Sequence, residues 1–410
     1  MNRMEVNLKK KKNILLYLAC YGGLFIFFLP VVDYYCSWYI NIFPVAFVLV
    51  LLFSTSKGQD SLVHIVPLIL AVALFDWYFI HRNYTFFSSV LDKVIALMPI
   101  LIAALLNISF IDKSFYRNYL QWGIILAAVT SITTYLGLKI YPMASRELAT
   151  STEIGDLYSR MNIGGFDYIY SLVMMIPFVL WMAKHSHGIM RIVNVFSMCC
   201  YILVIFQSQY TFALIGVILA FILLLFMKWP RIMALICICF LLVWLVFGGS
   251  LPSVIFRRLS EIIPLDYVSD RLLQVSQILA GKSVHTNTTT ERIDLMIQGI
   301  QTFLSNPVFG MRSLLFSNGG RLSGHSYIID ILASSGIVGF SIFVWIFHCF
   351  YRFTLGQKRN VSIPPIVKVV WIIFALIALV NPVILYLNMT VLFAFSICII
   401  KLSPSMEVQQ

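Results

Sequence analysis

The sequence predicts an all-α, polytopic membrane protein of about twelve transmembrane helices, with one large external loop late in the chain. Of its 410 residues, 60% are hydrophobic and only 11% are charged, whereas average soluble domains have roughly 45–50% and 25%. The apolar runs are continuous and about twenty residues long, which is the length a helix needs to cross the hydrocarbon core. Strands of an outer-membrane barrel would alternate apolar and polar residues instead. These features exclude a soluble enzyme and a disordered chain.

Twelve apolar runs define the expected spans. They lie at about 13–32, 37–54, 61–80, 94–111, 119–139, 168–183, 192–208, 211–227, 232–249, 326–350, 365–383 and 388–401. We expect three parts: residues 1–250 with spans one to nine and a first external loop at about 140–167, residues 251–325 as the large external loop, and residues 326–410 with the last three spans.

The distribution of Lys and Arg predicts the orientation of the spans. The formal net charge is +12, and in a polytopic protein Lys and Arg are retained on the cytoplasmic side. With the amino terminus inside, every short inner connection carries a positive charge, whereas the connections at 33–36, 209–210 and 384–387 carry none. We therefore expect both termini to be cytoplasmic and no nucleic acid to be a partner.

The two external loops are rich in arginine. They contain one lysine and eight arginines: Arg146, Arg160, Arg257, Arg258, Arg271, Arg292, Arg312 and Arg321. The planar guanidinium group can grip a phosphate through two parallel hydrogen bonds, whereas lysine acts as a point charge. The preference for arginine suits an anionic, phosphate-bearing ligand. The alternative is ordinary surface charge, paired with loop carboxylates such as Glu261 and Asp294.

The stretch from Arg292 to Phe340 has the most distinctive pattern. A helix-like run begins at Arg292. It is followed by Asn306-Pro307-Val308-Phe309-Gly310, in which Asn-Pro and Gly are typical of a turn. His325-Ser326 follows where the chain re-enters the membrane. Gly336 and Gly339, three residues apart on one expected helix face, predict close backbone contact within the bundle.

This stretch resembles the O-antigen ligase and Wzy-type polymerase superfamily. The pattern of that family is an Arg opening a loop helix, Asn-Pro-apolar-Phe-Gly, a His followed by Asn or Ser, and Leu-x-x-x-Gly-x-x-Gly. The corresponding residues here are Arg292, 306–310, His325-Ser326 and 332–339. Arg160, followed by Gly164-Gly165, resembles a second feature of the family.

Two departures from the family pattern favour a polymerase over a ligase that loads lipid A. Ser326 stands where ligases usually carry Asn, and Phe166-Asp167-Tyr168 replaces the usual small-residue and Asn-Pro sequence after Gly165.

The resemblance implies a glycosyltransferase at the outer face of a bacterial inner (plasma) membrane. Its donor would be a glycan on undecaprenyl pyrophosphate, and its acceptor a sugar hydroxyl on another lipid-linked repeat unit. Membrane lipid is a partner by location, and a chain-length regulator is a further candidate partner. We expect neither a metal nor a cofactor, because arginine can neutralise a pyrophosphate leaving group.

The resemblance also implies the site residues. His325, Arg160 and Arg292 are the expected catalytic residues, with His325 as the base for the acceptor hydroxyl. The expected substrate-binding residues are Arg146, Arg312, Arg321 and Asp330. Asp330 is a candidate for orienting His325, although a separation of five residues puts the two on different helix faces.

Other functions stay open. A ligase, or a polymerase for capsule or exopolysaccharide, belongs to the same superfamily. A flippase or other carrier belongs to a different class. The carrier is disfavoured because the bulk of the chain outside lipid lies between spans nine and ten, which breaks any two-fold repeat.

Overall fold

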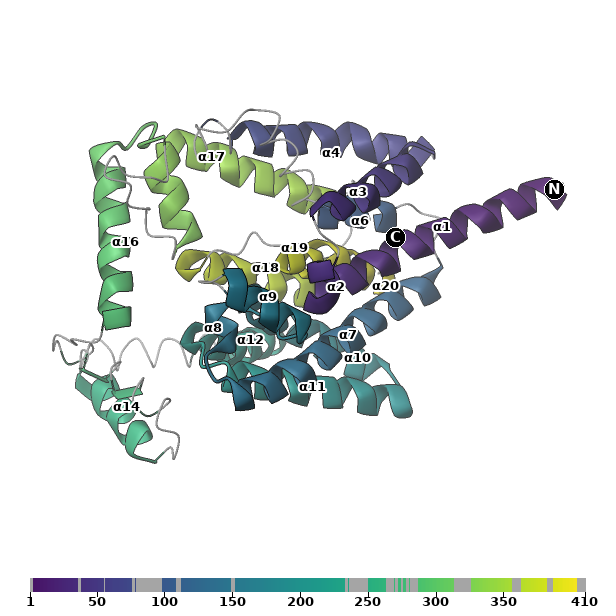
Figure 1. Cartoon of the computed structure of the whole chain (residues 1–410). Helices are drawn as coiled ribbons and strands as arrows, with labels where there is room; N and C mark the ends of the chain where they lie inside the picture. The colour runs from purple at the N-terminus through teal and green to yellow at the C-terminus, as the bar shows by residue number, and fades with distance from the viewer. Residues whose placement is uncertain are drawn as a thin grey trace.

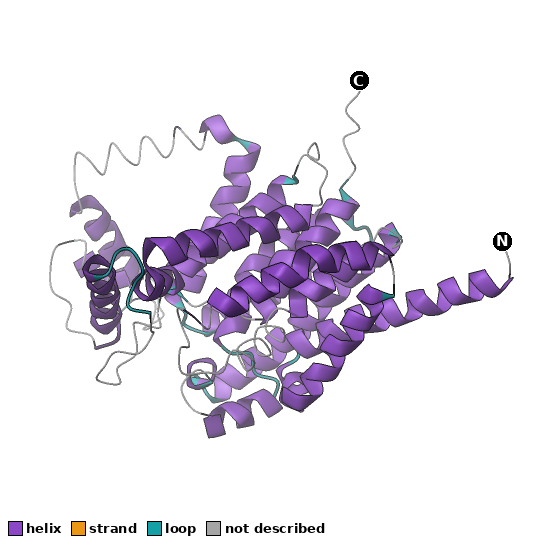
Figure 2. Cartoon of the chain, turned by 90° about the horizontal axis from the view of Figure 1, so that it is seen from above, coloured by secondary structure: helices purple, strands orange, loops and turns teal. Residues whose placement is uncertain are grey.

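The computed structural model describes residues 3–35, 38–54, 56–75, 78, 98–107, 112–148, 152–232, 235, 250–262, 269, 272–273, 276–277, 280, 287–312, 326–355, 363–381 and 386–403. Within these ranges the regular structure is helical and contains no strand (Figures 1 and 2). The predicted all-α fold is therefore confirmed.

The helices form a polytopic membrane bundle. Among the described residues, those long and apolar enough to cross a membrane belong to α4 (Ser56–Phe75), α7 (Lys113–Ile140), α10 (Phe166–His185), α11 (Ile189–Gln207) and α17 (Tyr327–Leu355). Further apolar helices are α1 (Arg3–Phe28), α3 (Trp38–Phe53), α6 (Met98–Asn107), α12 (Thr211–Lys228), α18 (Pro365–Val380), and the continuous run α19 (Tyr386–Met389), η2 (Thr390–Phe395) and α20 (Ser396–Leu402).

The predicted spans coincide with these helices, apart from 232–249, most of which lies outside the described residues. The first span needs a correction. It was predicted to run to residue 32, but α1 ends at Phe28 and a separate short helix, α2 (Pro30–Tyr35), follows. Pro30 explains the break, because proline has no N–H to donate and its ring clashes with the preceding turn.

The core of the bundle is centred on aromatic packing around Phe395. Its ring lies 5.8 Å from that of Phe28, 5.9 Å from Phe178 and 6.1 Å from Tyr119, measured between centroids. Gly123 on α7 makes room for it, because a Cβ there would lie 2.3 Å from the Phe395 ring. This close approach ties the last transmembrane helices to α1, α7 and α10.

Among the described residues, four further helices lie in or at the edge of the two predicted external loops. They are α8 (Ala144–Glu147), α9 (Thr152–Arg160), α14 (Ser250–Ile262) and α16 (Asn287–Ser305). Helix α9 packs against α2, and α16 packs against α17. Figure 1 shows α14 and α16 at one side of the molecule, whereas the amino-terminal part of α1 extends from the other side. The cytoplasmic location of the termini stays a prediction.

Candidate functional site

The chain after Arg160 forms a turn (residues 160–165) that is fixed to α2 and to α7. Asn162 adopts a left-handed conformation, with φ 56°. Its side chain accepts a hydrogen bond from the backbone of Val31 (3.4 Å) and donates to the hydroxyls of Thr130 (3.2 Å) and Thr133 (3.1 Å). The Asn162 carbonyl accepts from Thr133 at 2.7 Å. These bonds hold the turn rigidly at the end of α9.

The glycines of this turn are required by close packing. The Gly164 N–H donates to the hydroxyl of Thr134 at 2.8 Å. A Cβ on Gly164 would lie 2.2 Å from the ring of Tyr168. The Tyr168 hydroxyl is itself held, 2.8 Å from that of Ser131. A larger residue than glycine at position 164 would therefore displace the turn and the Arg160 that precedes it.

The guanidinium group of Arg160 lies over the ring of Tyr34. Its guanidinium carbon lies 4.7 Å from the ring centroid of Tyr34 on α2, and one guanidinium nitrogen donates a hydrogen bond to the Tyr34 hydroxyl. The Arg160 side chain is exposed. Because guanidinium has five N–H donors, donors remain that can bind an anion.

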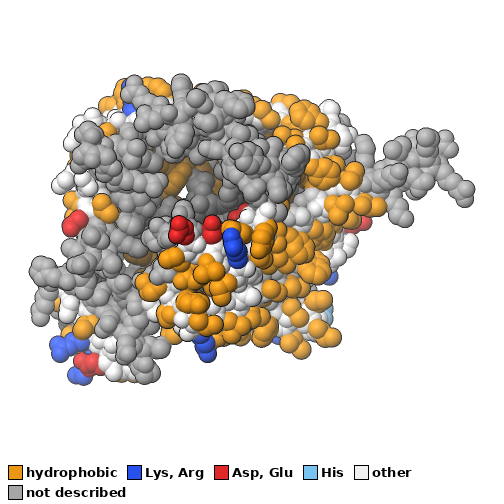
Figure 3. Space-filling model, in the orientation of Figure 1, with side chains coloured by type: hydrophobic (Ala, Val, Ile, Leu, Met, Phe, Trp, Pro, Cys, Tyr) orange, Lys and Arg blue, Asp and Glu red, His pale blue; other side chains and the backbone are white. Residues whose placement is uncertain are grey.

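A carboxyl pair accompanies this arginine. Asp33 precedes Tyr34 on α2, and Asp167 lies in the first turn of α10. The Asp33 side chain keeps an exposed edge but is crowded by protein. Loss of hydration raises its pKa to about 6, and repulsion from Asp167 adds to the increase. Figure 3 shows charged side chains near the centre of this face, over α9 and beside a hollow.

The Asn-Pro-Val-Phe-Gly turn (residues 306–310) docks onto α17 through its backbone. The N–H of Ile337 donates to the Pro307 carbonyl at 2.8 Å, and that of Val338 donates to the Val308 carbonyl at 3.2 Å. These are groups that an unbroken helix would satisfy internally. The turn thus supplies acceptors to helical N–H groups left free by a break in α17.

The break lies at Gly336, which has φ 64°. A Cβ on Gly336 would lie 2.4 Å from the Val308 carbonyl oxygen, and one on Gly310 (φ 65°) would lie 2.4 Å from the Ser334 carbonyl carbon. The prediction that Gly336 and Gly339 form one helix face for bundle packing was therefore wrong for Gly336. The close backbone contact exists, but its partner is the 306–310 turn.

Arg312 is the charged residue that this docking positions. Its N–H donates to the Ser334 carbonyl at 2.7 Å, and its φ of 55° is uncommon for a residue with a side chain. The guanidinium carbon lies 5.3 Å from the ring centroid of Tyr78 and 5.5 Å from that of Phe309. Arg160 and Arg312 are thus both held on aromatic rings, in two separately built modules.

The segment with the docked turn and the broken helix resembles a known family. Residues 193–344 match the family model described as O-antigen ligase. The predicted resemblance to the O-antigen ligase and Wzy-type polymerase superfamily is confirmed over this segment. No curated protein and no solved structure matches the chain.

Within the O-antigen ligase segment, Ser326 fixes the start of α17. Its hydroxyl donates to the Leu379 carbonyl of α18 at 2.6 Å and accepts from the Ile329 N–H at 3.3 Å, which is the geometry of a helix N-cap. Asp330 lies in the first turn and is half-buried. His325 lies outside the described residues, but its neighbour Ser326 is anchored to two helices.

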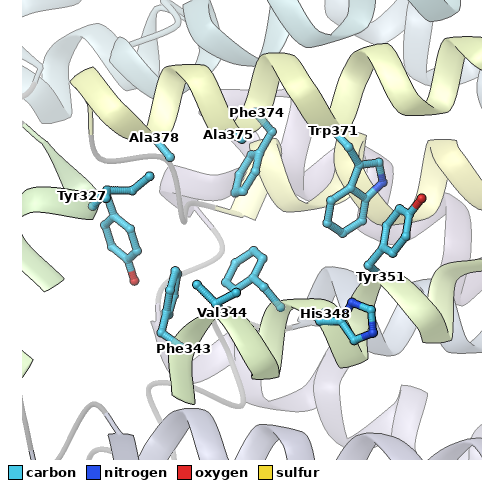
Figure 4. A pocket seen from close by; sticks show the side chains of 11 residues that line it. Tyr327, Phe343, Val344, His348, Tyr351, Trp371, Phe374, Ala375 and Ala378 are labelled. Carbon is cyan, nitrogen blue, oxygen red and sulfur yellow. The ribbon is translucent and has the colours of Figure 1, made fainter. Parts of the chain in front are cut away.

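An apolar groove begins beside this helix start. The α17–α18 groove is a cavity of about 300 Å³ lined by Tyr327, Ile328, Phe343, Val344, Phe347, His348, Tyr351, Trp371, Phe374, Ala375 and Ala378. Figure 4 shows Tyr327 and Ala378 at one end, and His348, Tyr351 and Trp371 at the other. The lining residues recur at helical spacing on both helices, so one face of each helix forms the groove.

The other predicted site residues are placed less completely. Arg292 lies on α16 and Arg146 on α8, but their side chains lie outside the described part of the structure, as does all of Arg321. Sequence reasoning missed Tyr34, Tyr78 and Asp33. No local pattern could have paired Tyr34 with Arg160, because the two are 126 residues apart in the chain.

Proposed function

We propose that the protein is a polysaccharide polymerase that joins lipid-linked repeat units at the outer face of the bacterial inner membrane. The observation that carries this proposal is the docking of the 306–310 turn onto the Gly336 break, inside the O-antigen ligase segment. This docking positions Arg312 at the break in α17, where its N–H contacts the Ser334 carbonyl. The proposal adds His325, two residues before α17 in the sequence, as the proton-accepting group.

The reaction is the transfer of a growing glycan from undecaprenyl pyrophosphate to a sugar hydroxyl of another repeat unit. The bond between the anomeric carbon and the pyrophosphate oxygen breaks, and the acceptor oxygen forms the new glycosidic bond. His325 takes the hydroxyl proton. The undecaprenyl pyrophosphate leaves with the electron pair, and Arg160 and Arg292 neutralise its charge.

Arg146, Arg312 and Arg321 would bind the remaining phosphate oxygens and sugars, and Asp330 would orient His325 from the first turn of α17. The aromatic support under Arg160 and Arg312 favours this role, because it fixes the guanidinium planes before the substrate arrives.

The α17–α18 groove favours a lipid-linked donor as the substrate. One end of the groove is formed by Tyr327, which comes two residues after His325 in the sequence, and the lining is mainly aromatic and aliphatic. A polyprenyl chain lying there would place its pyrophosphate next to the start of α17. The groove therefore matches a substrate with a long apolar chain and a charged head.

Ser326 and Phe166-Asp167-Tyr168, which replace residues usual in ligases, favour the polymerase. A ligase, or a polymerase of capsule or exopolysaccharide, is the alternative within the superfamily. A chain-length regulator would act with the polymerase as a further partner.

A deletion strain whose surface glycan is displayed on a gel tests the proposal, with the wild-type gene on a plasmid as control. Single capped repeats without a ladder of chain lengths are expected from loss of a polymerase. Absence of all attached glycan would instead indicate a ligase, and accumulation of units inside the cell would indicate a flippase. Either of the last two results would overturn the proposal.

A further inference from the structure

Helix α14 in the large external loop has its polar and apolar sides reversed relative to a helix that packs against a protein core. Ser253 and Ser260, seven residues apart and therefore on one face, are buried. The Ser253 hydroxyl lies 3.3 Å from that of Ser276, and the Ser260 carbonyl accepts from the Ser269 hydroxyl at 2.7 Å. The side turned towards the loop is thus built from hydroxyls.

The outward side is apolar. Val254 is 57% exposed, Ile255 50%, Leu259 41% and Ile262 74%. Ile255, Leu259 and Ile262 are spaced by four and three residues, so they form one stripe roughly opposite the buried serines. An amphipathic helix in water hides such a stripe. Something apolar must therefore cover this one.

Two arginines lie on the rest of the helix surface: Arg258 borders the stripe, and Arg257 lies on the other side of the helix. The side chains of Arg257 and Arg258 are 69% and 74% exposed, and both pair with Glu261, at 3.5 and 3.1 Å. One carboxylate serves two guanidinium groups, so the border keeps a net positive charge. Cations beside an apolar stripe are the pattern of helices that lie in the headgroup layer of anionic membranes.

Chain continuity places α14 at the membrane surface. The apolar run 232–249, a predicted span, ends immediately before Ser250, where α14 begins. The sequence Gly248-Gly249 precedes the helix, and Pro252 lies in its first turn. Thirteen residues at 1.5 Å each span about 20 Å. The whole helix therefore lies within that distance of the point where the chain leaves the hydrocarbon.

We propose that α14 is an interfacial helix that lies in the outer headgroup layer of the membrane. Val254, Ile255, Leu259 and Ile262 point towards the acyl chains, and Arg258 contacts the phosphates of anionic lipids. Figure 1 shows α14 apart from the packed transmembrane helices, as such an anchor requires. The anchor holds the loop close to the membrane surface, and it does not depend on the reaction proposed above.

The test measures lipid contact in the full-length protein in nanodiscs of phosphatidylethanolamine and phosphatidylglycerol. Ile255→Cys, Ile262→Cys and, as the matched control on the other side of the helix, Arg257→Cys are labelled with a bimane fluorophore. The unsubstituted protein, labelled identically, gives the background from native cysteines. Each sample is compared in lipids with brominated and ordinary acyl chains, and then with aqueous iodide as quencher.

We expect brominated lipid to quench the labels at positions 255 and 262 at least twofold more than the label at 257, with iodide giving the reverse order. Equal quenching at all three positions would overturn the proposal. Labels at 255 and 262 shielded from both quenchers would overturn it too, because a protein surface, from this loop or from a second copy, would then cover the stripe. Replacement of phosphatidylglycerol by phosphatidylcholine should reduce quenching by brominated lipid. Unchanged quenching would contradict the proposed contact between arginine and anionic lipid phosphate.

Discussion

Gly336 and Val308 are in direct backbone contact, and this contact joins the 306–310 turn to a transmembrane helix. The Val308 carbonyl accepts a hydrogen bond from Val338 and occupies the space where a Cβ of residue 336 would lie. Helix α17 and the 306–310 turn therefore form one unit, which holds Arg312 at the break in α17.

A Gly336→Ala substitution should destabilise this unit. Alanine at φ 64° costs roughly 1–3 kcal/mol from backbone strain alone, and its methyl group would clash with the Val308 carbonyl. Thermal unfolding in detergent should show a lower Tm, together with loss of glycan polymerisation. Gly22→Ala is the matched control, because a Cβ there meets nothing within 4 Å. Equal Tm values for the two variants would contradict the role of the contact.

The spans could be predicted because each depends on the composition of a single continuous stretch. The break at Gly336 could not, since a glycine in an apolar run is equally compatible with helix packing and with a kink. Its cause is a carbonyl supplied by another segment. The pairing of Arg160 with Tyr34 was hidden for the same reason, whereas the importance of Arg160 itself was visible from the glycines that follow it.

Lysine substitutions at the two supported arginines test whether they bind pyrophosphate. Arg160→Lys and Arg312→Lys keep the charge but lose the bidentate fork. Loss of one charge-assisted hydrogen bond is worth roughly 1.5–3 kcal/mol, so transfer rates should fall about ten- to hundred-fold. Arg257→Lys, on α14, should leave the rate unchanged. Full activity of both site variants at native expression would show that these arginines bind something else.

The raised pKa of Asp33 predicts a pH-dependent stability. Its carboxyl group has a pKa of about 6 in the folded protein, above the ordinary 3.8. The folded state therefore binds this proton more tightly than the unfolded state, and stability falls as the pH rises from about 4 to 6. Asp33→Asn, which cannot ionise, should have a Tm advantage over the wild type that grows through this range. Asp156→Asn, on exposed α9, is the control, and a constant Tm difference for Asp33→Asn would refute the prediction.

Filling the α17–α18 groove should weaken binding of long polyprenyl donors selectively. Ala375 lines the groove and is exposed, so a phenylalanine there can occupy it without disturbing the core. If the phenylalanine displaces about two methylene groups of the polyprenyl chain, donor binding weakens by roughly 1.5 kcal/mol. We therefore expect the KM to rise about tenfold. Leu376→Phe, on the neighbouring exposed position, is the matched control. The KM for a donor with a short isoprenoid chain should change little, and an equal increase for short and long donors would exclude the groove as the chain site.

His325→Ala tests the proposed base. Ser326 fixes the start of α17 through Leu379 and Ile329, and the proposed function assigns the residue before it, His325, to take the acceptor proton. General-base assistance is worth roughly 10²–10⁴-fold in rate, and the variant should therefore leave single, unpolymerised repeats on the gel. Binding of the lipid-linked donor should persist, because the arginines remain. His185→Ala, at the far end of α10, controls for the loss of an exposed histidine. A normal ladder of chain lengths from His325→Ala would leave this residue with no part in the chemistry.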